Sequence, residues 1–228
     1  MLRKLLGVLV LTGLAQSASA QDRMDWMPWN RPGYAPPAYE RPAPHEREAI
    51  ERPMNLSAPP LVLDGGPRPS VSPALPERVS FSSSYVVGTI VIDTSERRLY
   101  LVQSPEEALV YPVSVGREGF AWTGAEKISR IASWPDWHPP AEMRERDPRL
   151  PEKMTGGVRN PLGAKALYLG NTLYRIHGTD NESTIGRASS SGCFRMTNGH
   201  VVDLASRVST GTAVIVLDKL PQNIAGLR

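Results

Sequence analysis

Cys193 and His177 are the residues of this sequence whose types and setting best suit nucleophilic chemistry. Cys193 lies in the glycine-containing stretch Ser190-Ser191-Gly192-Cys193-Phe194-Arg195, and His177 ends the apolar run at 172–176. A thiol with an ordinary pKa is only a few per cent ionised at neutral pH, so a cysteine nucleophile needs a neighbouring base. An imidazole held at the end of a strand can supply one. The pattern predicts a cysteine nucleophile with a histidine as its general base.

The glycines beside both residues have roles in this prediction. Gly192 permits a sharp turn, so that the amides of Gly192 and Cys193 can point at one spot and stabilise an oxyanion. Gly178, directly after His177, lets the backbone approach the imidazole closely. We expect both glycines to shape the site.

The use of cysteine agrees with an export signal at the start of the chain. Arg3 and Lys4 precede an apolar run at 5–14 and a small-residue stretch that ends at Ala20, which is typical of a cleaved signal peptide at 1–20. Exported proteins usually keep their cysteines in disulfides, so the single thiol of Cys193 indicates a chemical use. The alternatives are a buried, inert cysteine and a purely structural histidine. We expect a mature chain without a transmembrane segment, located outside the cytoplasm.

Residues 21–84 are rich in proline and poor in large aliphatic side chains, which predicts a disordered tail or linker. Aromatic residues within it leave two interpretations open, a solvated spacer or a partner-binding segment. Residues 85–218 form the one predicted domain, and 219–228 form a C-terminal tail.

The predicted domain is mainly β. About seven short strands are indicated by β-branched and apolar runs at 86–93, 98–103, 109–115, 126–132, 166–169, 172–177 and 212–217. A helix is expected after Thr197 or Asn198, with Val201, Leu204 and Val208 on one face. This favours a sandwich or barrel-like sheet with one or two short helices.

Charge and histidine placement argue against two other classes of function. A formal net charge of +3 is too small to indicate a nucleic-acid binder, although it is compatible with an anionic, carboxylate-rich polymer. His45, His138 and His200 are scattered and no second cysteine is available, so we expect no metal site and no cofactor.

Together these residues resemble the L,D-transpeptidase family with the YkuD-type catalytic domain. The resemblance rests on His177-Gly178, on Ser190-Ser191-Gly192-Cys193-Phe194-Arg195, and on the upstream stretches Trp137-His138-Pro139-Pro140 and Asn160-Pro161-Leu162-Gly163. Two departures stand out: Ser191 replaces a second histidine of many members, and Ala121-Trp122-Thr123-Gly124 replaces their Thr-Pro-Thr-Gly. The resemblance covers most of the predicted domain and leaves the proline-rich segment unexplained.

The resemblance implies acyl transfer in the bacterial cell envelope, in the periplasm, with a role in cell-wall organisation and cell shape. Cys193 would take an acyl group from a peptidoglycan tetrapeptide stem, release D-alanine, and pass the acyl group to an amine to form a 3-3 cross-link. Alternatives are a ligase that joins an envelope protein to the wall, an L,D-carboxypeptidase with water as acceptor, and a non-catalytic wall-binding module. Arg195, Ser191, Trp137 and Tyr168 are expected to contact the substrate, with Trp134, Trp137, Pro139 and Pro140 as a lid.

Overall fold

The computed structural model describes residues 61–221, and its main feature is a nine-stranded sheet with the order β12-β10-β9-β7-β13-β3-β4-β5-β2. The strands of this sheet are β2 (Glu77–Ser80), β3 (Ile90–Asp93), β4 (Arg98–Ser104), β5 (Glu107–Pro112), β7 (Gly124–Ser133), β9 (Lys165–Leu169), β10 (Arg175–His177), β12 (Phe194–Arg195) and β13 (Ala213–Leu217). Two smaller pairings are β1 (Val62–Leu63) with β8 (Lys153–Met154) and β6 (Val115–Gly116) with β11 (Ala188–Ser190). The mainly β fold class is therefore confirmed.

Both faces of the sheet carry apolar side chains, because the strand residues alternate between two buried clusters. In β3 and β4, Ile90 and Leu99 belong to one cluster, whereas Val91 and Tyr100 belong to the other. The first cluster also contains residues from β9, β10 and β12, at the far end of the strand order. The sheet thus curves so that its two halves share a core, as expected for a barrel-like arrangement.

Helix α2 (Asn198–Arg207) covers this shared core and confirms the predicted helix. Thr197 is the N-cap, and its side chain accepts a hydrogen bond from the backbone N–H of His200 (3.2 Å). Val201 and Leu204 are buried against the sheet. Only β12 and a short connection separate Cys193 from the helix, so the docking of the helix also fixes the end of the cysteine-bearing segment.

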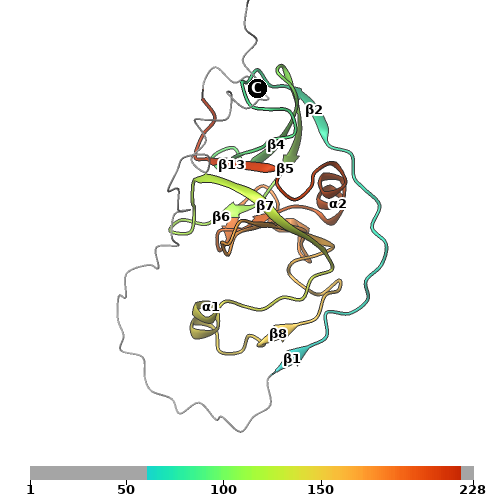
Figure 1. Cartoon of the computed structure of the whole chain (residues 1–228). Helices are drawn as coiled ribbons and strands as arrows, with labels where there is room; N and C mark the ends of the chain where they lie inside the picture. Colours follow the sequence, from blue (N-terminus) through green and yellow to red (C-terminus); the bar gives the residue numbers. More distant parts are fainter. Residues whose placement is uncertain (1–60, 222–228) are drawn as a thin grey trace, which may run out of the picture.

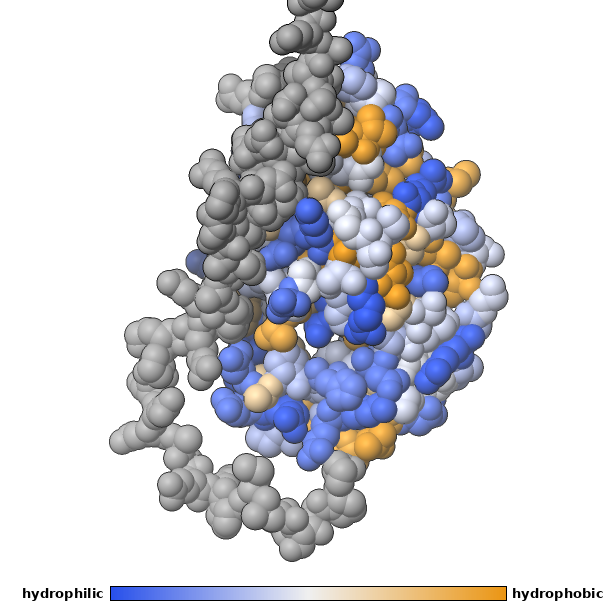
Figure 2. All heavy atoms as spheres, viewed as in Figure 1, coloured by the Kyte–Doolittle hydropathy of each residue, from blue (hydrophilic) through white to orange (hydrophobic). Residues whose placement is uncertain are grey.

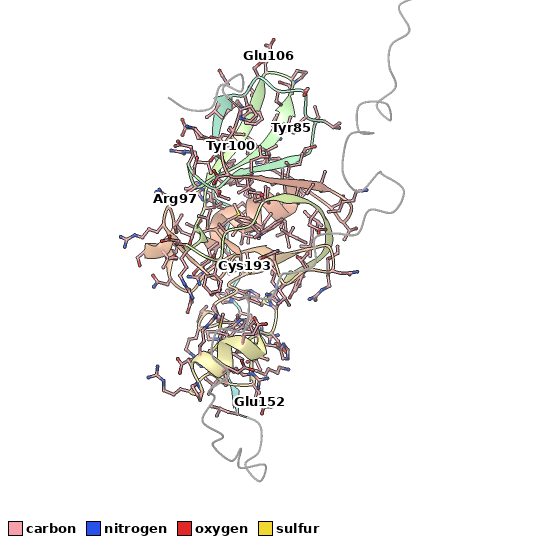
Figure 3. All side chains as sticks on the ribbon, turned by 90° about the vertical axis from the view of Figure 1, so that its left-hand side faces the viewer. Tyr85, Arg97, Tyr100, Glu106, Glu152 and Cys193 are labelled. Carbon is pink, nitrogen blue, oxygen red and sulfur yellow. The ribbon has the colours of Figure 1, made fainter. Side chains whose placement is uncertain are left out.

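A separate layer lies below the sheet in Figure 1 and is formed by residues 134–164, which we call the cap. The cap connects β7 to β9 and contains α1 (Ala141–Arg146) and β8. In Figure 3, Cys193 lies at the level where the sheet meets the cap, and Glu152 lies at the lower end of the cap. The cap therefore stands over the region that holds the predicted nucleophile.

Residues 61–80, which we call the strap, run along the side of the molecule from the cap to the opposite end of the sheet (Figure 1). At the cap, β1 pairs in parallel with β8, and at the other end β2 pairs antiparallel with β5. The predicted boundary at residue 84 therefore differs from the structure, in which residues 61–84 contribute two strands and the buried Phe81. The prolines of this segment are compatible with order because most of it is extended along other elements.

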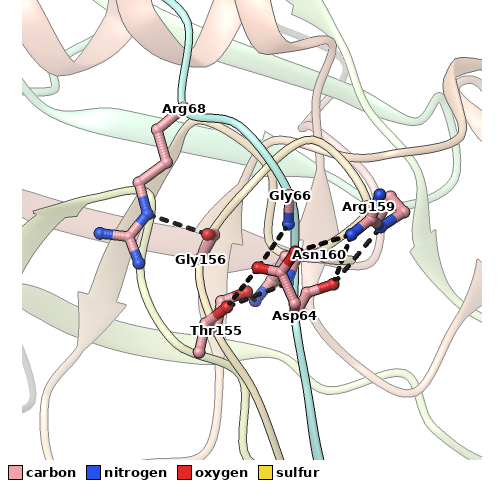
Figure 4. Close-up of polar contacts among 8 residues, drawn as sticks. Asp64, Gly66, Arg68, Thr155, Gly156, Arg159 and Asn160 are labelled. Atoms are coloured by element: carbon pink, nitrogen blue, oxygen red, sulfur yellow. Dashed lines mark hydrogen bonds and ion pairs between the residues drawn. The ribbon is translucent and has the colours of Figure 1, made fainter.

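Asp64 connects the strap to the cap (Figure 4). Its carboxylate accepts hydrogen bonds from the Thr155 hydroxyl (3.3 Å), from the Arg159 guanidinium (2.9 Å) and from the backbone N–H of Gly66 (3.1 Å). Arg68 adds a bond from its Nε to the carbonyl oxygen of Gly156 (2.9 Å). These contacts join segments that are far apart in the sequence.

The surface of the cap is mostly hydrophilic on the face drawn in Figure 2, with an apolar group at the lower tip, where β1 lies. Leu61, Val62 and Leu63 are exposed there. No helix within residues 61–221 has the length and apolar character that crossing a membrane requires. The predicted signal peptide at 1–20, most of the predicted tail and residues 222–228 lie outside the described residues.

Candidate active site

The parallel pairing of β10 with β12 brings the predicted nucleophile and base together. Ile176 pairs with Phe194 and His177 with Arg195, so one step back along both strands places Arg175 opposite Cys193. Residues two apart in a strand point to the same face. Arg175, His177, Cys193 and Arg195 accordingly line one pocket. The sheet register, rather than proximity in sequence, assembles this group.

His177 is held in the form that a general base requires. Its Nδ1 lies 2.6 Å from the carbonyl oxygen of Gly178, and a carbonyl only accepts hydrogen bonds, so Nδ1 carries the proton. The lone pair is then on Nε2. Burial is the main cause that lowers the pKa of His177 to about 3; the Gly178 contact opposes it, and the charges of Arg195 and Arg175 add to it. The imidazole is therefore neutral at pH 7 and able to take up a proton.

The Cys193 thiol is protonated in this arrangement. Burial raises the pKa of the thiol, and this outweighs the lowering caused by Arg175, through its charge and its hydrogen bonds, and by the charge of Arg195. The thiol donates a weak hydrogen bond to the carbonyl oxygen of Leu173 (Sγ···O 3.6 Å). The thiol would therefore need a base to become a thiolate.

The turn around Cys193 is fixed by Ser190, a buried hydroxyl. Ser190 Oγ donates to the carbonyl oxygen of Cys193 (2.6 Å) and accepts from the N–H of Gly192 (3.1 Å). Gly192 has φ of 103°, and a Cβ there would lie 2.7 Å from a ring carbon of Tyr174. Since Ser190 already takes the Gly192 amide, that amide is not free to bind an oxyanion as we expected. The Cys193 amide has no hydrogen-bond partner within residues 61–221.

Trp122 also supports the turn around Cys193. The sequence did not indicate this role. Its indole N–H donates to the carbonyl oxygen of Gly192 (3.2 Å). Its ring stacks on Tyr174, with ring centroids 4.3 Å apart. Trp122 lies in the stretch that departs from the family pattern, so this departure brings a side chain that braces the turn.

Asn198 braces the end of β10. Its amide oxygen accepts from the N–H of Ala164 (2.8 Å), and its amide nitrogen donates to the carbonyl oxygen of Thr179 (2.8 Å). A Cβ on Gly178 would collide with this amide oxygen, so the glycine is required for the close approach. The sequence suggested Asn198 only as a possible helix cap, a role that Thr197 performs.

The cap supplies much of the pocket wall. Trp137 and Pro140 of the predicted lid line the pocket, whereas Trp134 and Pro139 do not. The other cap residues of the wall are Glu142, Met143, Arg146, Pro161 and Leu162. Phe120 closes the wall from the opposite side, with the Arg117 guanidinium 4.2 Å and that of Arg146 5.2 Å from its ring centroid. The pocket is thus enclosed between the sheet and the cap.

The other residues predicted to contact substrate are divided between two pockets. Ser191 lines the pocket of Cys193 and accepts a hydrogen bond from the Arg117 guanidinium (3.4 Å), and Arg195 lines the pocket beside it. Tyr168 is not part of this pocket; it lines a neighbouring one. Arg175 lines both pockets, and only its place shortly before His177 could have indicated its importance. Within residues 61–221 no group of three or more histidine, cysteine or acidic side chains could hold a metal ion.

A comparison with known families gives the class of protein to which the mainly β fold and the pocket of Cys193 and His177 belong. Residues 88–216 match the family model of the YkuD L,D-transpeptidase catalytic domain, and the chain belongs to this family. The resemblance noted in the sequence is therefore confirmed.

A curated relative matches part of the chain. The chain is 36% identical to the probable L,D-transpeptidase YbiS of Escherichia coli over 139 residues. This match covers 57% of this chain and 44% of YbiS. The chain thus spans less than half the length of this curated relative.

Two solved structures are also similar. An L,D-transpeptidase from Mycobacterium smegmatis is 18% identical, with a TM-score of 0.47, and the match covers 57% of this chain and 58% of that one. A Brucella melitensis protein described as a probable carnitine operon oxidoreductase is 47% identical, with a TM-score of 0.43, over 62% of this chain and 92% of that one. The family membership rests on the matched domain model and not on these two TM-scores.

Proposed function

We propose that this protein is a peptidoglycan L,D-transpeptidase that uses Cys193 as nucleophile and His177 as general base. The observation that carries the proposal is the pairing of β10 with β12, which places both side chains in one pocket while Gly178 leaves Nε2 of His177 free to accept a proton. The donor is a tetrapeptide stem, and the acceptor amine belongs to a second stem. An exported, periplasmic location follows from the predicted signal peptide.

The first half of the reaction forms a thioester. The Cys193 thiol exchanges its contact with Leu173 for Nε2 of His177, gives up its proton and attacks the carbonyl of the third residue of the stem. The Cys193 amide stabilises the resulting oxyanion. When the carbon–nitrogen bond to D-alanine breaks, the imidazolium returns the proton to the departing amine. His177 is then neutral again, and Cys193 carries the acyl group as a thioester.

The second half transfers the acyl group. An acceptor amine attacks the thioester and loses a proton to His177, and the thiolate that leaves recovers this proton. The product is a 3-3 cross-link. With water as acceptor, the same steps would give a trimmed tripeptide, and with the amine of an envelope protein they would attach that protein to the wall.

The proposal is tested by incubating the protein with defined tetrapeptide stems and reading the products by mass. We expect a cross-linked dimer, released D-alanine, and a covalent adduct on the intact protein. Cys193→Ala should abolish product and adduct, and its unchanged circular dichroism spectrum would show that the fold persists. Product formation by Cys193→Ala would exclude Cys193 as nucleophile. An unchanged mixture with the unsubstituted protein would favour a protein acceptor or a wall-binding module.

A further inference from the structure

Three side chains form a row across neighbouring strands and lead toward Cys193. Arg130 of β7 and Arg175 of β10 are both register partners of Tyr168 in β9. The Arg130 guanidinium lies 3.7 Å from the centroid of the Tyr168 ring, and that of Arg175 lies 5.2 Å from it. The pairing of β10 with β12 continues the row to Cys193. We call Arg130, Tyr168 and Arg175 the arginine row.

The arginine row lines a second pocket that adjoins the pocket of Cys193. Arg175, Trp137 and Leu162 belong to the walls of both pockets, whereas Arg130 and Tyr168 belong only to the second. A ligand whose reacting carbonyl lies at Cys193 can therefore extend past Trp137 into the second pocket. The two pockets adjoin along the sheet.

The charge in the second pocket favours an anion. Neither Arg130 nor Arg175 forms an ion pair within residues 61–221, and the buried Nε of Arg175 has no hydrogen-bond partner there. Asp136 also lines the pocket, but its carboxylate is neutralised by Lys153 (2.6 Å) and accepts from the N–H of Gly156 (2.9 Å). His138 contributes the other titratable side chain of the lining. The two guanidinium groups therefore retain donors for an incoming acceptor.

We propose that the arginine row binds a free carboxylate of the peptide donor, separate from any group that Arg195 contacts. The proposal deepens the proposed function and rests on it. A guanidinium forms charge-assisted, often bidentate hydrogen bonds with a carboxylate, and the phenol of Tyr168 adds a further donor. Arg175 forms the near end of this carboxylate site and Arg130 the far end.

The distance between neighbouring strands limits which carboxylate of the donor can reach the arginine row. Neighbouring strands lie roughly 4.8 Å apart, so Tyr168 is about 10 Å and Arg130 about 14 Å from the Cys193 position. An extended peptide advances about 3.3 Å per residue. The bound carboxylate is thus two or more residues from the attacked carbonyl, or stands at the end of a long side chain. A carboxylate directly beside the reacting bond would lie too close.

The test compares donor tetrapeptides in which each carboxylate is free or amidated, with Arg130→Gln as the variant. Arg130 is exposed and distant from the thiol, so the substitution leaves the fold and the nucleophile in place. We expect the kcat/KM for acylation of the free peptide to fall roughly tenfold or more, mainly through KM. Amidation of the recognised carboxylate should cause at least the same loss in the unsubstituted protein, because it also weakens the contacts with Arg175 and Tyr168, and a clearly smaller loss in Arg130→Gln. Arg130→Lys should restore part of the activity.

Controls separate this proposal from the proposed function. Arg149→Gln removes the same charge at an exposed arginine outside both pockets and should not change kcat/KM. Calorimetric binding of the same peptides to Cys193→Ala requires no chemistry and should show the same preference for the free carboxylate. Equal effects of Arg130→Gln on free and amidated peptides, or none on either, would overturn the arginine row as a carboxylate site. A carboxylate preference without any acylation would instead overturn the proposed function.

Discussion

Arg175 determines the electrostatic setting of Cys193 more than any other side chain of the pocket. Its charge and hydrogen bonds lower the pKa of the thiol, against a larger increase caused by burial. The charge of Arg175 also contributes to the low pKa of His177. The same arginine thus favours a thiolate and disfavours an imidazolium. The resting pair is neutral, and the proposed function therefore requires proton transfer from Cys193 to His177 during the reaction.

This arrangement predicts the pH dependence of thiol reactivity. The rate of alkylation of Cys193 by iodoacetamide should rise with pH around a midpoint above that of an ordinary thiol, because burial raises the pKa of Cys193. Arg175→Gln should move that midpoint further upward, because a positive charge that stabilises the thiolate is lost. Mass spectrometry of the alkylated protein over a pH series measures both midpoints. Arg149→Gln serves as the charge control, and a midpoint below neutral pH would indicate a preformed thiolate–imidazolium pair.

The sequence indicated Cys193 and His177, which the structure brings into one pocket, but not the residues that support them. Cys193 and His177 could be recognised because their types, glycine neighbours and export context are all local features. Arg175 and Asn198 could not, since their importance arises from the register of β10 with β12 and from the contact of α2 with the end of β10. Neither this register nor this contact can be predicted from a single segment of the sequence.

At the scale of the elements, the long apolar runs were predictable and the short pairings were not. The strands β3, β4, β5, β7, β9, β10 and β13 each overlap a predicted run, although β5 starts two residues earlier than predicted, β3 starts only at Ile90 and β10 only at Arg175. Two-residue strands such as β1, β8 and β12 show no readable alternation, because a period of two needs a longer run. The cap was anticipated only as a lid of a few residues.

The contact between the strap and the cap can be tested at Asp64. Asp64→Ala removes the hydrogen bonds to Thr155, Arg159 and Gly66. Because the ion pair is exposed, we expect amide hydrogen exchange at 153–159 to accelerate by only roughly twofold to fivefold, with little change in the sheet. Asp147→Ala is the matched control, since Asp147 bonds locally to Arg149. Unchanged exchange at 153–159 in Asp64→Ala would mean that β1 and β8 are held by other contacts.

At the scale of the whole molecule, the strap makes the domain longer than its composition indicated. Proline content led to a predicted boundary at residue 84, but proline is compatible with an extended chain that lies along a sheet edge. Val79 and Phe81 are buried, and Phe81 stacks on Tyr100 with ring centroids 4.8 Å apart. The composition of a segment therefore did not reveal whether other elements hold it in place.

A comparison of two fragments tests this boundary. A fragment that begins at residue 85 lacks β2 and Phe81, and should lose at least about 3 kcal/mol of unfolding free energy from the missing aromatic alone. For a domain of this size, that corresponds to a midpoint lower by roughly 10 °C. Thermal unfolding followed by near-UV circular dichroism measures it. Equal melting of this fragment and of one that begins at residue 61 would contradict a structural role for residues 61–84.

The position of β1 has a mechanical consequence. The sequence that precedes residue 61 joins the domain at β1, and β1 is held by a two-residue pairing with β8 at the edge of the cap. A pulling force on that upstream sequence would therefore act on the pairing of β1 with β8 before it acted on any strand of the large sheet. This short pairing lies next to the wall of the pocket that holds Cys193, so a pull from upstream would disturb access to the thiol before it disturbed the sheet that carries it.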